Sequence, residues 1–439
     1  MGPIAGSPAG APPRGDAGDA AEYRGYEALL ALPDKERGDV GVLGWDARRM
    51  RRWLADLGLP QRRLRCSLVA GSKGKGSTAA MLAACLRAQG RRTGLYTQPH
   101  LHRYAERIRV DGRPLPAAVT RRGLRTVLAA APGPVTAFEA ATAYCLWAFA
   151  QAGVQEAVLE VGFGGRLDAT AECDPDLVLL VPIEGEHADL LGPTLRDVAM
   201  HDVALCRYGR TCYFSPQTPP VAALLHERFR VQGCAGGQVA PPEAVGRGRL
   251  RLRLPSGQRI ETALRVAGAF QQGNAALAAA GAAALGCTPP GIAAGLAAAR
   301  WPGRFERVAR RPEVIVDAAH TPMSAVAVRQ ALQAVAAGRP VALVVGMFAD
   351  KDARGFAAAF AGMGGRVWAT RPEHPRAMAA TGVAAAFASA CTGLRGLAEA
   401  PSCVAACAAA CAWAGPGGVV LVTGGHAVAA EARAHFLRR

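Results

Sequence analysis

The sequence predicts an α/β protein with two domains. From Leu64 onward, short runs of aliphatic and β-branched residues alternate with longer helix-forming segments, which is typical of a parallel sheet with crossover helices. A second series with the same alternation starts after Arg304. The chain has 439 residues, which is long enough for two domains that each bury a core of their own. Together these observations predict two α/β units in tandem.

The N-terminal segment differs from the rest of the chain. Residues 1–22 are rich in Gly, Ala and Pro and lack the basic and apolar regions of a signal peptide, so we expect a disordered tail there. The range 23–59 reads as helical, with Trp45, Met50 and Trp53 available to anchor it. The first structured element is therefore expected to be helical.

The first α/β unit follows in a regular order. The predicted strands are 66–70, 93–97, 157–161, 177–182 and 211–214, and the predicted helices between them are 78–89 and 138–152. Alternating Arg and Leu over 247–265 predicts a hairpin with its turn at 255–257, and 271–285 predicts a helix. We expect this N-terminal domain to span residues 23–300.

The second unit has the same pattern on a smaller scale. The predicted strands are 314–316, 341–345, 367–370 and 419–423, with helices such as 323–336 and 354–361 between them. The Trp301–Pro302–Gly303 stretch marks a break before this pattern begins. We expect a Rossmann-like α/β domain over 301–439.

Charge and cysteine usage restrict the kind of protein. The formal net charge is +17, but the arginines are spread along the chain and no nucleic-acid-binding motif is present, so we expect no nucleic-acid partner. A basic surface favours anionic small molecules. The 12 cysteines have no zinc-type spacing, and Cys403, Cys407 and Cys411 are interpreted as packing residues of one helical stripe. Free thiols and the lack of a uniformly apolar span predict a cytoplasmic protein without a membrane segment.

The segment VAGSKGKGST, residues 69–78, is the most informative stretch. An apolar run ends at a glycine-rich turn that opens into a helix-like segment. This arrangement is typical of loops that cradle phosphate, because backbone N–H groups and the positive end of the helix dipole point at the anion. The loop is one residue shorter than the usual G-x-x-x-x-G-K-[ST] form. We predict a nucleotide site in an ATPase domain, built from Gly71, Gly74, Lys75, Gly76, Ser77 and Thr78.

Lysine usage supports this prediction. The chain has four lysines, and two of them, Lys73 and Lys75, lie in this loop. A compact ammonium suits phosphate better than a planar guanidinium fork does. Lys75 is therefore expected to reach the outer phosphates, and Ser77 or Thr78 to offer a hydroxyl to Mg²⁺.

Six motifs follow one another along the chain: VAGSKGKGST, GLYTQPHLHRYAERIRVDG, LEVGFGGRLDAT, GRFE, DAAHTP and ADKD. Together they resemble the folylpolyglutamate synthase/dihydrofolate synthase family of the Mur ligase superfamily. The resemblance runs from about Leu64 to Arg433. It implies an ATP-dependent ligase that phosphorylates a carboxylate and then joins it to L-glutamate. The implied acceptors are a reduced folate or dihydropteroate, and the implied cofactors are ATP and Mg²⁺.

The resemblance also implies a metal site. Glu160, at the end of a predicted strand, would bind Mg²⁺ together with Ser77. His187, in EGEHADLLG, matches the metal-binding histidine of the family, although Glu186 and Ala188 replace its neighbouring Asp and Thr. Lys75, Glu160 and His187 are thus the expected catalytic residues.

The largest departure from the family concerns a lysine, carbamylated in many members, that helps to hold a second metal. The corresponding position is Asp202, and the chain has no lysine between Lys75 and Lys351. Three interpretations remain open. Asp202 or His201 binds the metal through water, the second metal is lost, or the activity is altered.

The remaining nucleotide contacts are implied by later motifs. Asn274, three residues after Gln271, matches the asparagine that reads adenine. Arg304 would contact phosphate oxygens, Asp317 the ribose, and His320 the phosphates. Because these last three residues belong to the second domain, ATP is expected to lie in a cleft between the domains, whose closure would exclude water.

The segment 97–109 resembles the family region beside the pterin and the acyl acceptor, with Gln98 in place of a serine. The segment 370–377 offers Arg371, His374 and Arg376 for an anionic amino acid, and 350–352 is expected to be a fold-closing loop.

Two alternatives to a folate ligase stay open. One is a Mur-superfamily paralogue that uses another carboxylate, and the other is a nucleotide-binding relative without catalysis. A monomer is expected in each case.

Overall fold

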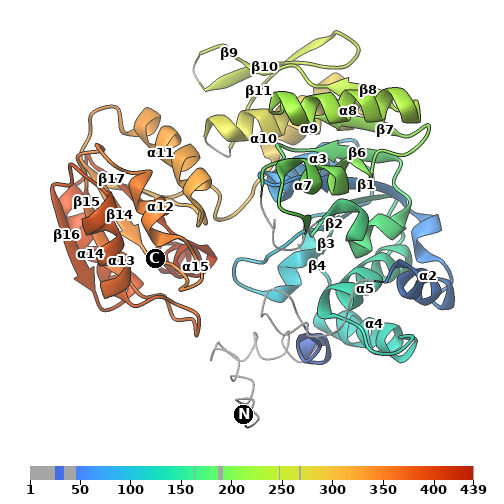
Figure 1. Cartoon of the computed structure of the whole chain (residues 1–439), viewed down its shortest axis with the longest axis horizontal. Coiled ribbons are helices and arrows are strands. Elements are labelled where there is room, and N and C mark those ends of the chain that lie inside the picture. Colours follow the sequence, from blue (N-terminus) through green and yellow to red (C-terminus); the bar gives the residue numbers. More distant parts are fainter. Residues whose placement is uncertain are drawn as a thin grey trace.

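The structure is a computed structural model that describes residues 25–33, 46–162, 164–185, 191–246, 248–265 and 268–438. Within these ranges the chain forms two bodies, each built around its own sheet (Figure 1). The N-terminal body carries the larger sheet and the C-terminal body, orange to red in Figure 1, the smaller one. The two-domain α/β fold predicted from the sequence is confirmed.

The larger sheet has eight strands in the order β4-β3-β2-β5-β1-β6-β7-β8. The run from β2 to β8 is parallel, whereas β3 and β4 add antiparallel strands at one edge. The strands are β1 Arg65–Ala70, β2 Thr93–Tyr96, β3 Ile108–Val110, β4 Arg113–Pro114, β5 Glu156–Glu160, β6 Leu177–Leu180, β7 Thr211–Phe214 and β8 Ala235–Gln238. All five predicted strands of this domain are present.

Helices cover both faces of this sheet. The side chains of β1 alternate between two hydrophobic clusters, so Cys66 and Leu68 face one layer and Val69 the other. The helices that share the Val69 cluster are α3 Lys75–Ala88, α9 Ala269–Ala284 and α10 Pro289–Ala298. Those that share the other cluster are α2 Ala47–Asp56, α4 Ala117–Ala129, α5 Ala137–Gln151, α7 Leu195–Val203 and α8 Pro219–Gln232.

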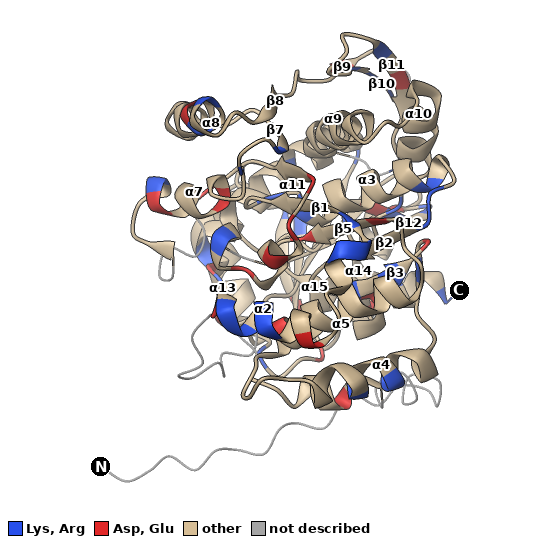
Figure 2. Cartoon of the chain, turned by 90° about the vertical axis from the view of Figure 1, so that its right-hand side faces the viewer, with Lys and Arg blue, Asp and Glu red and all other residues tan. Residues whose placement is uncertain are grey.

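Short 3₁₀ turns connect some of these elements, at Pro60–Arg63, Tyr104–Arg107, Gly165–Leu167 and Ala169–Cys173. Figure 2 shows α2 and α4 in one view, each with ribbon segments that belong to Lys or Arg. The two helices are tied together where the indole N–H of Trp53 donates to the carbonyl of Val127 at 2.9 Å. The predicted anchors Met50 and Trp53 are both buried.

Two predicted helices need correction. The range 23–59 is not helical throughout, because turn residues at 31–32 end the helical residues 25–30 before α2 begins. Trp45 and the tail 1–22 lie outside the described residues. The helix after the glycine-rich loop begins at Lys75 rather than at residue 78, since Gly74 in a left-handed conformation already serves as its N-cap. Gly76, Ser77 and Thr78 therefore belong to the first turn of α3.

A small antiparallel sheet lies above α9 and α10 in Figure 1. It contains β9 Glu243–Ala244, β10 Arg249–Arg253 and β11 Arg259–Ala263. The predicted hairpin is confirmed as β10 and β11, in which leucine and isoleucine are buried and the arginines point outward.

The C-terminal sheet has the order β12-β13-β17-β14-β15-β16, parallel except for the edge strand β12. Its strands are β12 Glu306–Arg310, β13 Glu313–Val316, β14 Val341–Val345, β15 Arg366–Thr370, β16 Gly396–Ala400 and β17 Val419–Thr423. One face is covered by α11 Pro322–Ala336, α12 Ala353–Ala358 and α13 Ala380–Ala390, the other by α14 Cys403–Ala414 and α15 His426–Leu437. The chain passes from α10 to β12 through residues 299–305, and we keep residue 301 as the proposed domain boundary.

The cysteine stripe of α14 is part of a core. Cys403 and Cys407 are buried in the cluster between α14 and the sheet, and Cys411 packs against the same cluster. This confirms their interpretation as packing residues.

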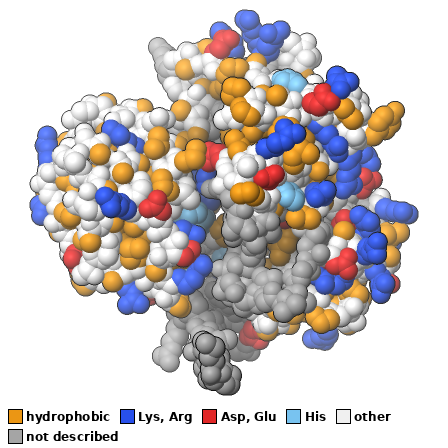
Figure 3. Space-filling view, in the orientation of Figure 1, with side chains coloured by type: hydrophobic (Ala, Val, Ile, Leu, Met, Phe, Trp, Pro, Cys, Tyr) orange, Lys and Arg blue, Asp and Glu red, His pale blue; other side chains and the backbone are white. Residues whose placement is uncertain are grey.

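On the face shown in Figure 3, Lys and Arg side chains are spread over both bodies. Among the described residues, no helix has the length and apolar character needed to cross a bilayer.

Candidate functional site

The glycine-rich loop connects β1 to α3 at the carboxyl end of the parallel sheet. Gly71 and Gly74 have φ values of 111° and 105°, which a side chain would disfavour. A Cβ on Gly71 would lie 2.7 Å from the carbonyl oxygen of Val181, and one on Gly74 would lie 2.9 Å from Cγ of Asn274. The positive φ values, together with the close approach of the Val181 backbone and of the Asn274 side chain, require glycine at both positions.

The loop is held to the segment after β6. The backbone N–H of Ser72 donates to the carbonyl of Pro182 at 2.9 Å. The Ser72 hydroxyl donates to the carbonyl of Glu184 at 3.2 Å and accepts from the N–H of Glu184 at 2.8 Å. These bonds fix the loop conformation without using the N–H groups of the first turn of α3.

Lys75 is placed at the start of this helix. Its ammonium donates to the carbonyl of Gly71 at 2.7 Å and to that of Ser72 at 3.3 Å. The charge therefore lies over the loop, on the side where the helix N-terminus opens. The neighbouring Ser77 and Thr78 are both buried in the first turn.

Glu160 is the last residue of β5 and lies beside β1, which leads into the loop. Its side chain is 5% exposed, and its Oε2 accepts the backbone N–H of Gln98 at 2.9 Å. Burial raises the pKa of Glu160 to about 7, although Lys75 and Arg304 oppose that shift. A Cβ on Gly76 would lie 3.1 Å from Oε2 of this carboxylate. The predicted catalytic lysine and carboxylate are thus brought together.

Asp202 lies on α7 and faces the same region. It is 6% exposed, and burial raises its pKa to about 6, with Lys75 opposing the shift and Asp168 adding to it. A Cβ on Gly165 would lie 2.8 Å from Cα of Asp202, so the Gly165 turn brings this helix close. The residue that replaces the expected lysine is therefore near Lys75.

Asp168 is a residue that sequence reasoning did not single out. It is 2% exposed, and its Oδ1 accepts from both the N–H and the hydroxyl of Thr170, at 2.9 and 2.6 Å. A Cβ on Gly162 would lie 2.8 Å from its Oδ2 and 2.9 Å from Nε2 of Gln98. Its place in the motif LEVGFGGRLDAT, just after a glycine-rich turn, was the available signal.

One predicted metal ligand and its two neighbours fall in a part of the chain that is not described. His187, Glu186 and Ala188 lie outside the described residues. The described parts of the chain contain no group of three His, Cys, Asp or Glu side chains arranged to hold a metal ion. Ser77, Glu160 and Asp202 remain predicted ligands.

The start of α9 contacts the loop from the other side. Nδ2 of Asn274 donates to Oε1 of Gln271 at 3.0 Å, and the Asn274 carboxamide lies against Gly74. Gln271 is fully buried, and within the described structure its Nε2 has no hydrogen-bond partner. Both predicted residues are adjacent to the phosphate loop.

Arg304 and Asp317 belong to the C-terminal body. Each oxygen of Asp317 accepts one backbone N–H at 2.7 Å, from Phe305 and from Ala319. Burial raises the pKa of this carboxyl group, and Arg304 opposes the shift. Asp317 is only 3% exposed, and its bond to the N–H of Phe305 holds the turn next to Arg304. Its predicted ribose contact stays a prediction.

His320 faces the phosphate loop across the domain junction. Its Nδ1 lies 3.0 Å from the carbonyl of Ala318. Burial lowers its pKa, and the positive charges of Lys73 and Lys351 lower it further. Lys73 lies in the loop and His320 in the C-terminal body, so this charge effect acts across the domain junction. The predicted ATP cleft between the domains stays a prediction.

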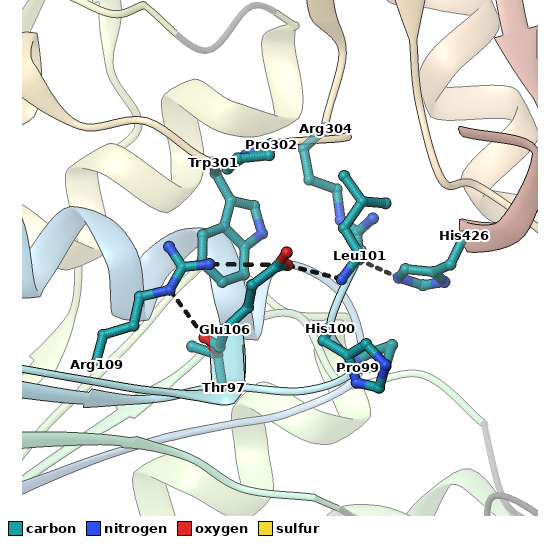
Figure 4. Close-up of a pocket in the computed structure, with 10 residues that line it drawn as sticks. All are labelled: Thr97, Pro99, His100, Leu101, Glu106, Arg109, Trp301, Pro302, Arg304 and His426. Carbon is teal, nitrogen blue, oxygen red and sulfur yellow. Dashed lines mark hydrogen bonds and ion pairs between the residues drawn. The ribbon is translucent and has the colours of Figure 1, made fainter. Parts of the chain in front are cut away.

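A small pocket lies at this junction (Figure 4). Its lining comes from both bodies: Thr97, Pro99, His100, Leu101, Glu106, Arg109, Trp301, Pro302, Arg304 and His426. Nη2 of Arg304 lies 2.9 Å from Nε2 of His426. Arg107 donates through Nε to Nδ1 of His100 at 2.9 Å, and burial together with Arg107 lowers the pKa of His100 to about 3.

Two pocket residues were missed by sequence reasoning. Trp301 contacts α3, since a Cβ on Gly76 would lie 2.8 Å from its Cζ2. His426 follows a glycine pair directly after β17. The signal for His426 was its position at the carboxyl end of a parallel strand, where open sheets bind ligands. The other segment considered for an anion, 370–377, does not line this pocket.

Residues 303–426 match the family model described as Mur ligase, glutamate ligase domain. The chain is 34% identical over 300 residues to an Escherichia coli protein named dihydrofolate synthase/folylpolyglutamate synthase, covering 65% of this chain and 68% of that protein. It is 35% identical over 384 residues to a Halobacterium salinarum protein named "Probable bifunctional folylpolyglutamate synthase/dihydropteroate synthase". That match covers 84% of this chain but 47% of the relative, so the chain spans about half of that protein.

Two solved structures with related names superimpose on nearly the whole chain. A folylpolyglutamate synthase of Mycobacterium tuberculosis, solved with ADP and AMPPCP, superimposes with a TM-score of 0.83 at 29% identity, covering 96% of this chain and 99% of that one. A bifunctional folylpolyglutamate synthase/dihydrofolate synthase of Yersinia pestis, solved with AMPPNP and a Mn ion, gives a TM-score of 0.81 at 26% identity, covering 95% and 98%.

Proposed function

Because the chain belongs to the folylpolyglutamate synthase/dihydrofolate synthase family, we propose that it is an ATP-dependent ligase that joins L-glutamate to a folate-type carboxylate. The acceptor would be tetrahydrofolate, dihydropteroate or both. The observation that carries this proposal is the meeting of two sets of groups at the domain junction. Lys75 and Glu160 come from the N-terminal body, and Arg304 and His320 from the C-terminal body.

This arrangement suits phosphoryl transfer to a carboxylate. That reaction needs positioning and charge neutralisation rather than covalent help from the protein. The loop and the N-terminus of α3 would hold the phosphates, with Lys75 and Arg304 as positive groups on either side. An acyl phosphate formed there would be attacked by the glutamate amine, with loss of phosphate. A junction that closes around the site would protect this intermediate from hydrolysis.

The site also fits a divalent cation. Glu160 is a buried carboxylate whose raised pKa shows that it lacks full charge compensation in the protein alone. Ser77 follows Gly76, whose lack of a side chain lets Glu160 and Trp301 approach the first turn of α3 closely. We propose that Ser77 and Glu160 hold Mg²⁺, with His187 and Asp202 as further ligands. Bound Mg²⁺ would neutralise charge on the transferring phosphate.

The nucleotide base and ribose would extend away from the loop. We propose that Asn274, near the start of α9, reads the adenine, as its family motif implies. We propose Asp317 for the ribose and His320 for the phosphates. Each assignment rests on the position of the residue at the junction together with its family motif.

A second candidate function is favoured by two substitutions beside the reacting groups. Gln98 places a buried Nε2, unpartnered in the described structure, close to Asp168, and Asp202 stands where the family has a lysine. Both change the chemistry next to Glu160 and Lys75. A paralogue that ligates an amino acid to a different carboxylate would account for them.

The deciding experiment is mass spectrometry of the purified protein incubated with ATP, Mg²⁺, L-glutamate and either tetrahydrofolate or dihydropteroate. A product heavier by one glutamyl unit, with equal release of phosphate, supports the ligase and names its acceptor. ATP binding without product from either acceptor would favour the paralogue or a relative without catalysis.

Location and assembly remain proposals. All 12 cysteines are free thiols, 10 of them buried, which supports a reducing compartment such as the cytoplasm. A monomer is still the prediction, and light scattering coupled to size-exclusion chromatography would test it.

A further inference from the structure

A hydrogen-bonded contact joins the two bodies beside the pocket. His102 lies in the loop between β2 and β3, and Arg433 lies on α15. Nη1 of Arg433 is 3.1 Å from Nε2 of His102, and its Nε donates to Oε2 of Glu306 at 2.8 Å. The same Glu306 oxygen accepts the backbone N–H of Gly303 at 2.8 Å. Arg433 therefore bridges a loop of one body and a turn of the other.

Both ends of this bridge lead into the proposed site. On the N-terminal side, Gln98 in the same loop donates its backbone N–H to Glu160. On the C-terminal side, Gly303 immediately precedes Arg304. The two segments also touch, since a Cβ on Gly303 would lie 3.0 Å from Leu101. A shift of the bridge would thus change the distance between Arg304 and Glu160.

The loop itself is preorganised for this contact. Glu106 accepts the backbone N–H groups of Leu101, His102 and Arg103 at 3.0, 3.3 and 3.2 Å. These three bonds hold the loop in one shape and direct the His102 ring toward α15. The contact is therefore between two ordered elements rather than between mobile side chains.

We propose that Arg433 is a positioning residue, which bridges His102 and Glu306 and so sets the approach of the C-terminal domain to the phosphate loop. The effect of Arg433 on kinetics rests on the proposed ligase function, whereas the effect of Arg433 on domain arrangement does not. Arg433 touches no reacting atom in this scheme and acts through the turn that carries Arg304.

The bridge requires a neutral His102. A guanidinium can only donate, so Nε2 of His102 must accept and cannot carry a proton. The charged groups that face this ring are Glu106 and Arg103 from its own loop, Arg433 from α15 and Glu306 from β12. A protonated His102 would lose the acceptor and place a positive charge against Arg433. The bridge is therefore intact at pH 8 and weakens as the pH falls through the pKa of His102, which burial lowers below its usual value.

The test compares Arg433→Gln, Arg433→Lys and His102→Gln with the wild-type protein. The matched control is Arg339→Gln, which removes an arginine that pairs with Glu313 inside the C-terminal domain at 2.8 Å. Thermal melting of each variant checks that it folds. Small-angle scattering with AMPPCP and Mg²⁺, measured as a pH series from 8 down to about 4.5, reports domain arrangement. Ligase kinetics at pH 8 report the effect of each variant on the reaction.

We expect Arg433→Gln to be more open than wild type in scattering at pH 8 and to lose about 10- to 100-fold in kcat/KM. Arg433→Lys should recover part of that loss, because an ammonium can reach one partner but not span both. His102→Gln keeps an acceptor that does not titrate, so it should stay closed over the pH range, below the ordinary pKa of 6.5, in which wild type opens. Arg339→Gln should behave as wild type throughout.

Two results would overturn the proposal. The first is an Arg433→Gln variant with wild-type scattering and kinetics. The second is a His102→Gln variant that opens with falling pH as much as wild type does, or a wild-type protein that does not open anywhere in the series. If no acceptor gives a product, the ligase function fails, but the scattering comparison still decides the role of Arg433.

Discussion

At the scale of single residues, the proposed site depends on groups whose charge is set by burial. Lys75 and Glu160 lie at the same loop, where Glu160 is buried and Lys75 is half-buried. Gln98, Asp168 and Asp202 add polar groups around them. Because a charge is felt more strongly when water is excluded, each of these residues has a large expected effect.

Lys75→Ala should lower the rate of phosphate release by on the order of 10²- to 10³-fold, because it removes a positive group from the transferring phosphate. The side chain bonds to two loop carbonyls and contributes no apolar core packing, so the fold should stay intact. Lys75→Arg keeps the charge with the wrong shape and should retain part of the activity. Normal turnover by Lys75→Ala would refute the phosphate-loop assignment.

Glu160→Gln should abolish Mg²⁺-dependent turnover yet stabilise the metal-free protein. The folded protein holds a proton on Glu160 up to about pH 7, whereas its ordinary pKa is 4.5. The ionised group therefore costs stability as the pH rises through that window, and the cost is complete at pH 8. In EDTA at pH 8, we expect the free energy of unfolding to rise by about 1–3 kcal/mol, with the difference shrinking toward zero near pH 4.5.

Urea denaturation at both pH values measures this difference. Glu156→Gln, at the other end of β5, is the activity control, since Glu156 pairs with Arg91 at 2.6 Å away from the loop. A Glu160→Gln variant that still turns over with Mg²⁺ would show that another group holds the metal.

At the scale of elements, the junction of β1, the loop and α3 is fixed by backbone geometry. The sequence predicted strand, loop and helix in the correct order, but it placed the helix start at residue 78. The structure begins α3 at Lys75 because Gly74 takes the N-cap position. At that position Asn274 of α9, 200 residues later in the chain, lies against Gly74.

Gly74→Ala should destabilise the protein and weaken nucleotide binding. A Cβ at this position would be strained by the positive φ and would collide with the Asn274 carboxamide. Gly90→Ala is a matched control, because Gly90 has a φ of 73° and open space around its Cα. We expect a loss of about 1–2 kcal/mol for Gly90→Ala and about 3 kcal/mol or more for Gly74→Ala.

Urea unfolding and isothermal titration with AMPPCP measure the two effects. Gly90→Ala should bind the nucleotide normally. If the two variants lose equal stability and both bind, the contact between Gly74 and Asn274 has no role in shaping the loop.

At the scale of the whole molecule, the site exists only where the two bodies meet. Trp301 occupies that place, next to Gly76 of α3 and under Arg109, whose Cζ lies 5.8 Å from the centre of the indole ring. The Arg433 bridge holds the same junction from the far side of the pocket. Changes at the nucleotide site and changes in domain arrangement should therefore be linked.

Trp301 should report nucleotide binding through its fluorescence. Titration with ADP and Mg²⁺ should change the tryptophan emission of the wild-type protein, because the ligand would enter beside Gly76. Trp301→Phe should remove that change. Trp413→Phe is the control, since Trp413 packs against Trp368 inside the C-terminal domain, with ring centres 6.0 Å apart. An unchanged response in Trp301→Phe would mean that the nucleotide lies elsewhere.

The sequence by itself determined the α/β class, nine strands of the two main sheets and the strand–glycine loop–helix order, because periodicity and glycine spacing are local properties of the chain. It did not predict the parallel strands β8 and β16 or the antiparallel strands β3, β4 and β12 at the sheet edges. It also indicated Lys75, Glu160, Arg304 and His320 through their motifs. Only the tertiary structure decided that Asp202 lies beside Lys75 and Asp168, and that His102, Arg433 and Glu306 connect the domains. These contacts join residues far apart in sequence, and their burial and charge depend on how the helices and loops pack. No local pattern encodes that information.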